Sequence, residues 1–186
     1  MNTDGNYNMK KIYFAGHFNK THDTTDVAQM LRFDYRAKLL KTPEHMAYHC
    51  DNLRINDKYL YCGPFYVEKT PDGKISATDS EVVISTEYSQ VKSCDIFVVV
   101  FDKSVSTGAV TELAWAINHK KQIYILYIEQ PSTHDIKSDY WFAIADAIRR
   151  NKNTTVIAYK KESEIVEIIK QKILKEYTKL NIKNLN

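Results

Sequence analysis

The stretch Thr107–Ala116 has the clearest chemical character in the chain, because the carboxylate of Glu112 stands there among small and apolar residues. It follows the unbroken apolar run Ile96–Phe101 and a short polar loop. This order predicts a buried strand, a loop, and a helix that begins near Gly108. In open α/β sheets, ligands bind at the carboxyl ends of strands, where helix N-termini point their amides. We therefore interpret Glu112 as a nucleophile.

The predicted place of Glu112, within about a turn of its helix's start, favours the ionised carboxylate by roughly 0.3–1 kcal/mol. A low pKa suits a carboxylate nucleophile, and the small neighbours Ala109 and Ala116 leave room above it for a ligand. A glutamate at a helix start can also simply stabilise the helix. The apolar flanks argue against that simpler role, since a carboxylate among them needs a partner.

Three further side chains are candidates for the same crevice. Ser106, with the amides that follow it, forms a pocket for a hydroxyl or a phosphate, and it also fits a simple helix N-cap. Glu87 lies between Val83 and Val91 on one helix face, where burying an acid is costly unless it contacts a ligand or a polar group. Tyr13 belongs to the first predicted strand, where a core aromatic is the simpler interpretation.

Strands and helices alternate along the chain. This order predicts one three-layer α/β/α sandwich with a five-stranded, mostly parallel, flavodoxin-like sheet over residues 10–186, after a flexible leader of residues 1–9. The predicted strands are Lys11–Ala15, Lys58–Cys62, Cys94–Phe101, Gln122–Ile128 and Thr154–Ala158. The predicted helices run from about Thr25 to Pro43, from Ser80 past Val91, over Gly108–His119 and Ser138–Arg150, and from a Ser163 cap to Tyr177. The region Thr42–Asp57 fits either a short helix or a loop.

Composition narrows the class of protein. The 186 residues are 44% hydrophobic and 26% charged, as in one soluble domain, and no apolar stretch is long enough to span a membrane. Three cysteines without a paired motif and no secretory signal predict a cytoplasmic protein with reduced thiols. The net charge of +3 comes largely from a lysine-rich C-terminus, and no stripe of arginine and aromatic residues predicts a nucleic-acid partner.

The chain offers no cofactor motif. It lacks a Walker loop, a Rossmann glycine fingerprint and a nucleophile elbow. His45 and His49 are four residues apart, but without a matching acid or cysteine pattern we expect no metal site.

Three motifs together resemble the nucleoside 2-deoxyribosyltransferase family, including the related deoxyribonucleoside 5′-monophosphate N-glycosidases. They are Ile12–Phe18, the pair Cys94-Asp95 and the segment Gly108–Ala116. The resemblance implies that Glu112 attacks the anomeric carbon of a nucleoside or nucleotide, forming a glycosyl-enzyme ester that a second base or water resolves with retention.

The resemblance also assigns roles to other positions. Tyr13 orients the nucleophile, and Glu87, eight residues before Asp95, contacts the departing base. The small-molecule substrate lies against Gly16, His17, Phe18, Ser106 and Gly108. The family's pattern further implies a homo-oligomer, with no cofactor.

This chain departs from the transferase pattern at several positions. Transferases often carry an Asp at the position of Ser106, where it grips the sugar 5′-hydroxyl, whereas a Ser is similar to the monophosphate N-glycosidases. The usual Gly-Thr is Gly108-Ala109, the acid matching Glu87 is commonly Asp, and the family's partner-subunit Asn has no clear match around Lys137 and Ser138.

Three functions therefore remain open: a nucleoside 2-deoxyribosyltransferase, slightly favoured; a deoxyribonucleoside 5′-monophosphate N-hydrolase; and a non-catalytic nucleotide-binding or sensing module. The base and sugar preference stay open, and we expect residues 42–73 to encode substrate choice.

Overall fold

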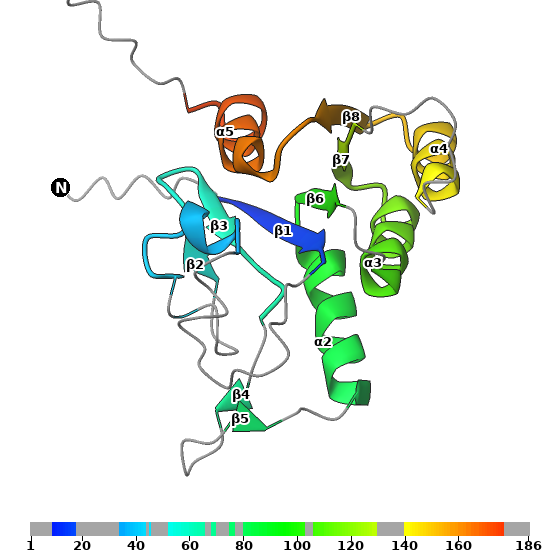
Figure 1. Ribbon diagram of the computed structural model, residues 1–186. Helices are drawn as coiled ribbons and strands as arrows, with labels where there is room; N and C mark the ends of the chain where they lie inside the picture. Colours follow the sequence, from blue (N-terminus) through cyan, green and yellow to red (C-terminus); the bar gives the residue numbers. More distant parts are fainter. Residues whose placement is uncertain are drawn as a thin grey trace, which may run out of the picture.

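The computed structural model describes residues 9–17, 34–43, 45, 52–65, 68–69, 75–76, 80–102, 106–129 and 140–176. Its centre is a six-stranded sheet in the order β2-β3-β1-β6-β7-β8 (Figure 1). The strands are β1 (Lys10–Gly16), β2 (Leu53–Arg54), β3 (Tyr59–Tyr61), β6 (Ile96–Phe101), β7 (Gln122–Ile128) and β8 (Thr154–Tyr159). A separate antiparallel pair joins β4 (Glu68–Lys69) to β5 (Ile75–Ser76).

The five strands β3, β1, β6, β7 and β8 are parallel and have the flavodoxin-like order that the sequence predicts. The sixth strand, β2, was not predicted. It pairs antiparallel with β3 after a turn in which the Asn56 side chain accepts the amides of Lys58 and Tyr59 at 2.9 and 3.1 Å. An asparagine that bonds to the backbone two residues on favours such a turn.

Helices cover both faces of the sheet, which confirms the three-layer prediction (Figure 1). One face is covered by α2 (Ser80–Ser93), α3 (Thr107–Asn118) and α4 (Trp141–Arg150). The other is covered by the 3-10 turn η1 (Ala37–Leu39) and by the C-terminal elements η3 (Glu162–Glu164), α5 (Ile165–Ile168) and η4 (Ile169–Ile173).

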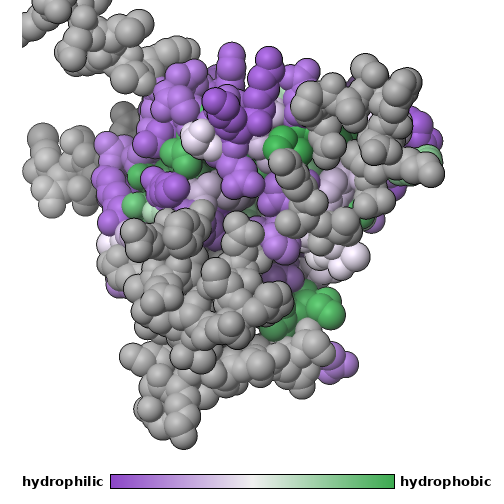
Figure 2. Space-filling model, viewed as in Figure 1, coloured by the Kyte–Doolittle hydropathy of each residue, from purple (hydrophilic) through white to green (hydrophobic). Residues whose placement is uncertain are grey.

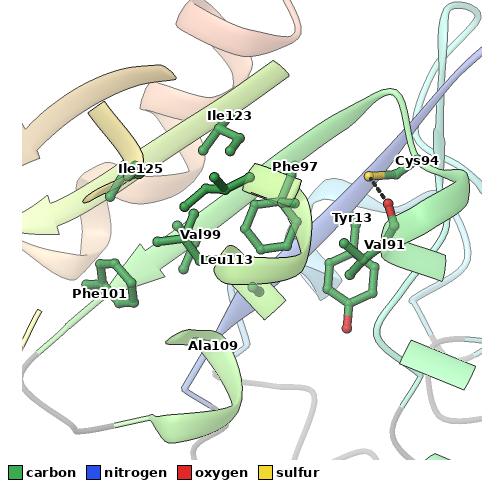
Figure 3. Packing of buried hydrophobic residues seen from close by; sticks show 14 of the residues in the cluster. Tyr13, Val91, Cys94, Phe97, Val99, Phe101, Ala109, Leu113, Ile123 and Ile125 are labelled. Atoms are coloured by element: carbon green, nitrogen blue, oxygen red, sulfur yellow. Dashed lines mark hydrogen bonds between the residues drawn. The ribbon is translucent and has the colours of Figure 1, made fainter. Parts of the chain in front are cut away.

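Strand β6 shows why the chain folds into layers. Its six side chains are all buried, and they alternate between the two cores. Phe97, Val99 and Phe101 pack under α3 together with Tyr13 of β1 (Figure 3). The intervening Ile96, Val98 and Val100 pack toward α5. An apolar run with no polar alternation thus marks a central parallel strand.

Two helix predictions need correction. Within the described part of the helix predicted up to Pro43, the chain forms the 3-10 turn Ala37–Leu39 and no α-helical turn. The last helix is not capped by Ser163; it begins as 3-10 turn η3 and ends as the π-helical turn η4. Its residues Ile165, Ile169 and Ile173, which are four positions apart, are buried against the sheet.

Several predictions fall outside the described residues: the leader except Met9, residues 18–33, the start of the helix predicted from Ser138, and Tyr177. Among the described helices, none is long and apolar enough to cross a membrane. In the view of Figure 2 the described surface is mainly hydrophilic, and hydrophobic residues form small separate patches.

Candidate active site

Tyr13 and Glu112, predicted as the catalytic pair, meet in the core between β1 and α3. The Tyr13 hydroxyl donates a hydrogen bond of 2.5 Å to Oε1 of Glu112. Tyr13 is fully buried and its ring stacks on Phe97 with a centroid distance of 5.8 Å, while Glu112 is only 6% exposed. The packing of α3 on β1 therefore holds a carboxylate against a fixed hydroxyl donor.

The pKa of Glu112 corrects the sequence interpretation. Burial raises it to about 8, the hydrogen bond from Tyr13 lowers it, the charge of Glu87 raises it, and the charge of Arg36 lowers it. Glu112 is the sixth residue of α3, beyond the first turn, where the helix dipole acts most strongly. Desolvation therefore outweighs the dipole, and the expected low pKa of Glu112 is wrong.

The small residues Ala109 and Ala116 have a different role from the one predicted. Both are buried in the core cluster with Tyr13 and Phe97. They let α3 pack closely on the sheet, so the space they leave is filled by protein and does not serve a ligand.

Glu87 reaches the same site from α2, which packs beside α3 and β1. Its charge raises the pKa of both Tyr13 and Glu112, and partial burial raises its own pKa. The predicted buried stripe on α2 is buried at Val91, whereas Val83 is 37% exposed. Glu87 thus lies where the helix passes from solvent into the core.

Glycines shape the strand ends around Tyr13. Gly16 has φ of +149°, and a Cβ there would lie 3.0 Å from the carbonyl oxygen of Val100. Gly63, which follows the predicted strand Lys58–Cys62, has φ of +143°, and a Cβ there would lie 2.8 Å from Cε2 of Tyr13. Only glycine fits both conformations without strain. Phe18 lies outside the described residues.

Ser106 is the N-cap of α3, accepting the amide of Ala109 at 3.2 Å. Its own amide donates to the hydroxyl of Tyr140 at 2.6 Å, and the Tyr140 ring stacks on Phe101 at 4.0 Å. Gly108 is exposed, with no atom within 4 Å of the place that a Cβ would occupy. The start of α3 is therefore fixed in place and open on one side.

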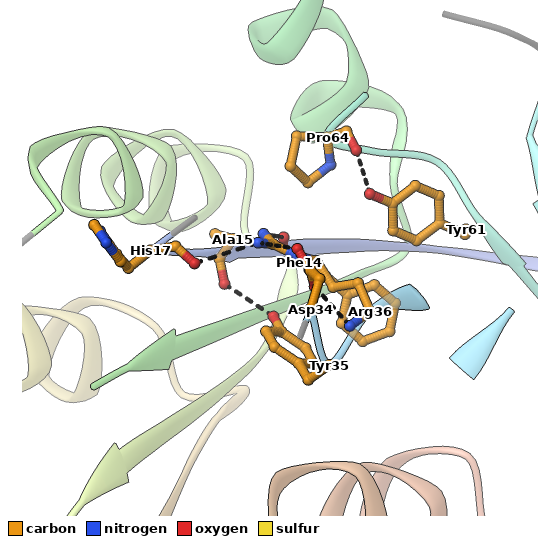
Figure 4. Close-up of polar contacts among 8 residues, drawn as sticks. All are labelled: Phe14, Ala15, His17, Asp34, Tyr35, Arg36, Tyr61 and Pro64. Atoms are coloured by element: carbon orange, nitrogen blue, oxygen red, sulfur yellow. Dashed lines mark hydrogen bonds and ion pairs between the residues drawn. The ribbon is translucent and has the colours of Figure 1, made fainter. Parts of the chain in front are cut away.

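Asp34 and Arg36 are residues that sequence analysis missed. They form a buried ion pair of 2.8 Å, and Arg36 donates to the carbonyl of His17 at the end of β1 (Figure 4). The helix predicted from about Thr25 to Pro43 gave no reason to pair these residues, because residues two positions apart do not face each other on a helix. The sequence did contain a signal for this pair: an acid and a base stand on either side of Tyr35, just before Ala37. Tyr140, which falls within the predicted helix Ser138–Arg150, was also missed as a residue of the site.

Within the described residues, no group of three or more His, Cys, Asp or Glu side chains is placed to hold a metal ion. Cys62 and Cys94 are buried free thiols. Burial raises the pKa of Cys94 to about 12, so its thiol is not an activated nucleophile. His45 is exposed, and His49 lies outside the described residues. The polar groups that converge here are carboxylates, a tyrosine and an arginine.

Comparisons with known proteins agree with this architecture. No protein-family model and no curated protein sequence matches the chain. Among solved structures, the Clostridium botulinum CMP N-glycosidase BcmB superposes with a TM-score of 0.53 and 16% identity, over 88% of this chain and 100% of that one. The chain has the fold of this CMP N-glycosidase. At the level of the fold, this likeness agrees with the resemblance seen in the motifs.

A second solved structure is the translation elongation factor SelB of Methanococcus maripaludis, in complex with a GTP analogue. It superposes with a TM-score of 0.50 and 12% identity, over 90% of this chain and 33% of that one. At such identities both likenesses concern the fold alone, and function must be argued from the site.

Proposed function

We propose that this protein is an N-glycosidase that hydrolyses the bond between base and sugar in a nucleoside 5′-monophosphate, with Glu112 as nucleophile. The observation that carries the proposal is the buried hydrogen bond from Tyr13 to Glu112 within the fold of a CMP N-glycosidase. The serine at position 106, where many transferases carry an acid, favours a phosphorylated substrate.

In the first step the Glu112 carboxylate attacks the anomeric carbon and the glycosidic C–N bond breaks. The electron pair of that bond leaves with the base, which takes a proton from the Glu87 carboxyl group. Burial raises the pKa of Glu87, which favours the protonated form that this step needs. The product is a glycosyl ester of Glu112.

In the second step water attacks the anomeric carbon of that ester. The water gives a proton to the Glu87 carboxylate, and the bond between the sugar and Glu112 breaks to return the carboxylate. Two displacements at one carbon retain its configuration. Each residue is thereby restored for the next cycle.

Tyr13 has a specific part in this reaction. Glu112 must be ionised to attack, but burial raises its pKa to about 8, and the hydrogen bond from Tyr13 lowers it. That bond occupies Oε1 and leaves Oε2 for the anomeric carbon. Tyr13 thus stabilises the reactive form and fixes its orientation.

The start of α3 is the proposed place for the phosphate. Helix N-termini favour anions through their amides and dipole. The bond from Ser106 to Tyr140 fixes this helix end, and the exposed Gly108 leaves space beside it. An aspartate in place of Ser106 would repel the phosphate.

A nucleoside 2-deoxyribosyltransferase is the second candidate. The motif Gly108–Ala116 favours it, and it uses the same Tyr13 and Glu112 but passes the sugar to a second base instead of water. The non-catalytic binding or sensing module is the alternative from another class.

The test is chromatography after incubating purified protein with nucleosides and their 5′-monophosphates, ribo and deoxy, with and without a second free base. Base released from monophosphates without an acceptor supports the hydrolase. Base exchange on nucleosides supports the transferase. If no substrate is turned over and a monophosphate still raises the melting temperature, the chain is a binding module. Glu112→Gln serves as the control for contaminating activity.

Two expectations from the sequence stay predictions, the homo-oligomer and the cytoplasmic location. Large apolar side chains are exposed on α2 and α4, among them Ile84 at 54% and Phe142 at 86%. Exposed apolar residues of this size are compatible with self-association. Sedimentation equilibrium of the purified protein distinguishes monomer from oligomer.

A further inference from the structure

Asp34 and Arg36 form a rigid, buried, charged unit. The side chain of Arg36 is 1% exposed and that of Asp34 is 4% exposed. Nε and Nη2 of Arg36 donate to the two oxygens of Asp34 at 2.8 and 2.9 Å, and Oδ1 also accepts the Arg36 amide at 2.8 Å. A bidentate pair with an added backbone bond has little freedom to change its geometry.

This unit clamps the carboxyl end of β1. Arg36 donates from Nη1 to the carbonyl of Phe14 at 3.2 Å and from Nη2 to the carbonyl of His17 at 3.3 Å (Figure 4). Between them, the hydroxyl of Tyr35 donates to the carbonyl of Ala15 at 3.3 Å. The neighbouring strand β3 ends at Tyr61, so Arg36 provides a donor to Phe14 on that side of β1, while β6 stays paired with β1 up to Gly16 on the other side.

The clamped segment bears directly on Glu112. Tyr13, whose hydroxyl holds the carboxylate, precedes Phe14 in β1. Among the described residues, the charged or titratable groups that act on Glu112 come from three elements: Tyr13 on β1, Glu87 on α2, and Tyr35 with Arg36 on the segment before η1. Of these only Arg36 carries a positive charge.

We propose that Arg36, held by Asp34, is a positioning residue for Glu112: it fixes the end of β1 that carries Tyr13, whose hydroxyl holds the carboxylate. This inference rests on the proposed function, because it takes Glu112 as the reacting group. It gives the buried ion pair a role in the reaction as well as in folding.

The test compares three proteins. The double variant Asp34→Asn/Arg36→Met removes both charges together, which avoids leaving one charge buried and unpaired, and keeps an oxygen for the backbone amide. Arg36→Lys keeps the charge but loses the planar fork that spans two carbonyls. The control Asp146→Asn/Arg149→Met removes an exposed ion pair of 2.9 Å on α4.

The primary readout is the titration midpoint of the Glu112 carboxyl group. It is measured by ¹³C NMR on protein with labelled glutamate, and the Glu112 signal is identified by its absence in Glu112→Gln. In the double variant the midpoint should rise by about half a pH unit or more, because the hydrogen bond from Tyr13 loosens and the charge of Arg36 is lost, and both lower the pKa of Glu112. In the control it should stay at the wild-type value. In Arg36→Lys the midpoint should stay nearer the wild-type value, while kcat falls about tenfold through looser placement of Tyr13.

A folded double variant whose Glu112 midpoint equals that of the wild type overturns the inference, even if its melting temperature is lower. If the double variant does not fold, Arg36→Lys decides: an unchanged kcat and midpoint, with only lower stability, shows a purely structural role. If the wild type turns over no substrate, the proposed function fails. The NMR midpoint of the folded double variant still decides whether Arg36 acts on Glu112.

Discussion

The hydroxyl of Tyr13 and the carboxylate of Glu112 are joined by a 2.5 Å hydrogen bond although 99 positions separate them in the chain. The bond connects the central strand β1 to the second turn of α3 in a buried environment. Burial, followed by the charge of Glu112, raises the pKa of Tyr13 well above its usual value. The tyrosine therefore stays protonated and is a permanent donor to the carboxylate.

Replacing Tyr13 by Phe should reduce kcat/KM for base release by about 10- to 100-fold, because the carboxylate loses its only described hydrogen-bond donor. The acidic limb of the pH profile should also move to higher pH, since the bond from Tyr13 lowers the pKa of Glu112. Steady-state kinetics across pH measures both effects.

Tyr61→Phe is the matched control for this variant. Tyr61 is an equally buried tyrosine that faces the other core and donates to the carbonyl of Pro64. Its loss should lower the melting temperature without moving the pH profile. Equal pH profiles for the two variants would contradict a specific role for Tyr13.

Glu112→Gln should abolish base release and change how stability depends on pH. The pKa of Glu112 is raised from 4.5 to about 8 by burial, so between these values the native state binds more protons than the unfolded state. Wild-type stability from this group is therefore complete below about pH 4.5 and is lost as pH rises toward 8. Gln has no such loss, and it still accepts a bond from Tyr13.

The difference in unfolding free energy between Glu112→Gln and the wild type should thus grow with pH, by on the order of a few kcal/mol between pH 4.5 and 8. Urea denaturation at several pH values measures it. A difference that is constant over this range would mean that Glu112 titrates normally in the folded protein.

The sequence predicted the parallel strands well because their signal is local. β6 is six buried apolar residues in a row, and its alternating side chains supply both cores. The meeting of Tyr13 with Glu112 could also be anticipated, since neighbouring strands and the helix after β6 meet at one edge. These features depend on patterns of a few residues.

The Asp34–Arg36 pair and the pKa of Glu112 could not be predicted in the same way. Both depend on how completely elements that are distant in the sequence exclude water. Arg36 is 1% exposed because it lies against β1, and Glu112 is buried where α3 packs on α2 and β1. The sequence predicted a continuous helix from about Thr25 to Pro43, whereas the chain forms a short 3-10 turn at Ala37–Leu39. Tertiary contacts override local periodicity at these positions.

Ser106→Asp should separate phosphorylated from unphosphorylated substrates. An added negative charge at the start of α3 repels a phosphate there, so kcat/KM for monophosphates should fall at least about tenfold relative to nucleosides. Aspartate is also a good N-cap and should keep the bond to the Ala109 amide, so stability should change little. Competition assays with both substrate classes measure the ratio.

The control is Ser106→Thr, which keeps a neutral cap. It should leave the ratio of monophosphate to nucleoside activity near the wild-type value. If Ser106→Asp lowers both activities equally, the phosphate does not lie at this helix end, and the preference for nucleotides must come from another part of the chain.

Two glycines offer opposite outcomes for the same substitution. Gly63→Ala places a Cβ 2.2 Å from Oε1 of Gln90 and 2.8 Å from Cε2 of Tyr13, at a backbone φ of +143°. The end of the Gln90 side chain can move aside, but the buried Tyr13 ring cannot. We expect a loss of at least about 2 kcal/mol in unfolding free energy, from backbone strain and crowding together. Activity should fall as Tyr13 shifts from Glu112.

Gly108→Ala should instead leave the fold intact or stabilise it by up to about 1 kcal/mol, because alanine suits a helix better and no atom lies within 4 Å of the new Cβ. If the substrate phosphate occupies that space, KM should rise several-fold while the melting temperature does not fall. Kinetics and thermal denaturation of both variants give the two comparisons. An unchanged KM in Gly108→Ala would mean that the substrate phosphate does not bind at this helix end. Unchanged stability in Gly63→Ala would show that the Tyr13 ring is less firmly held than its packing indicates.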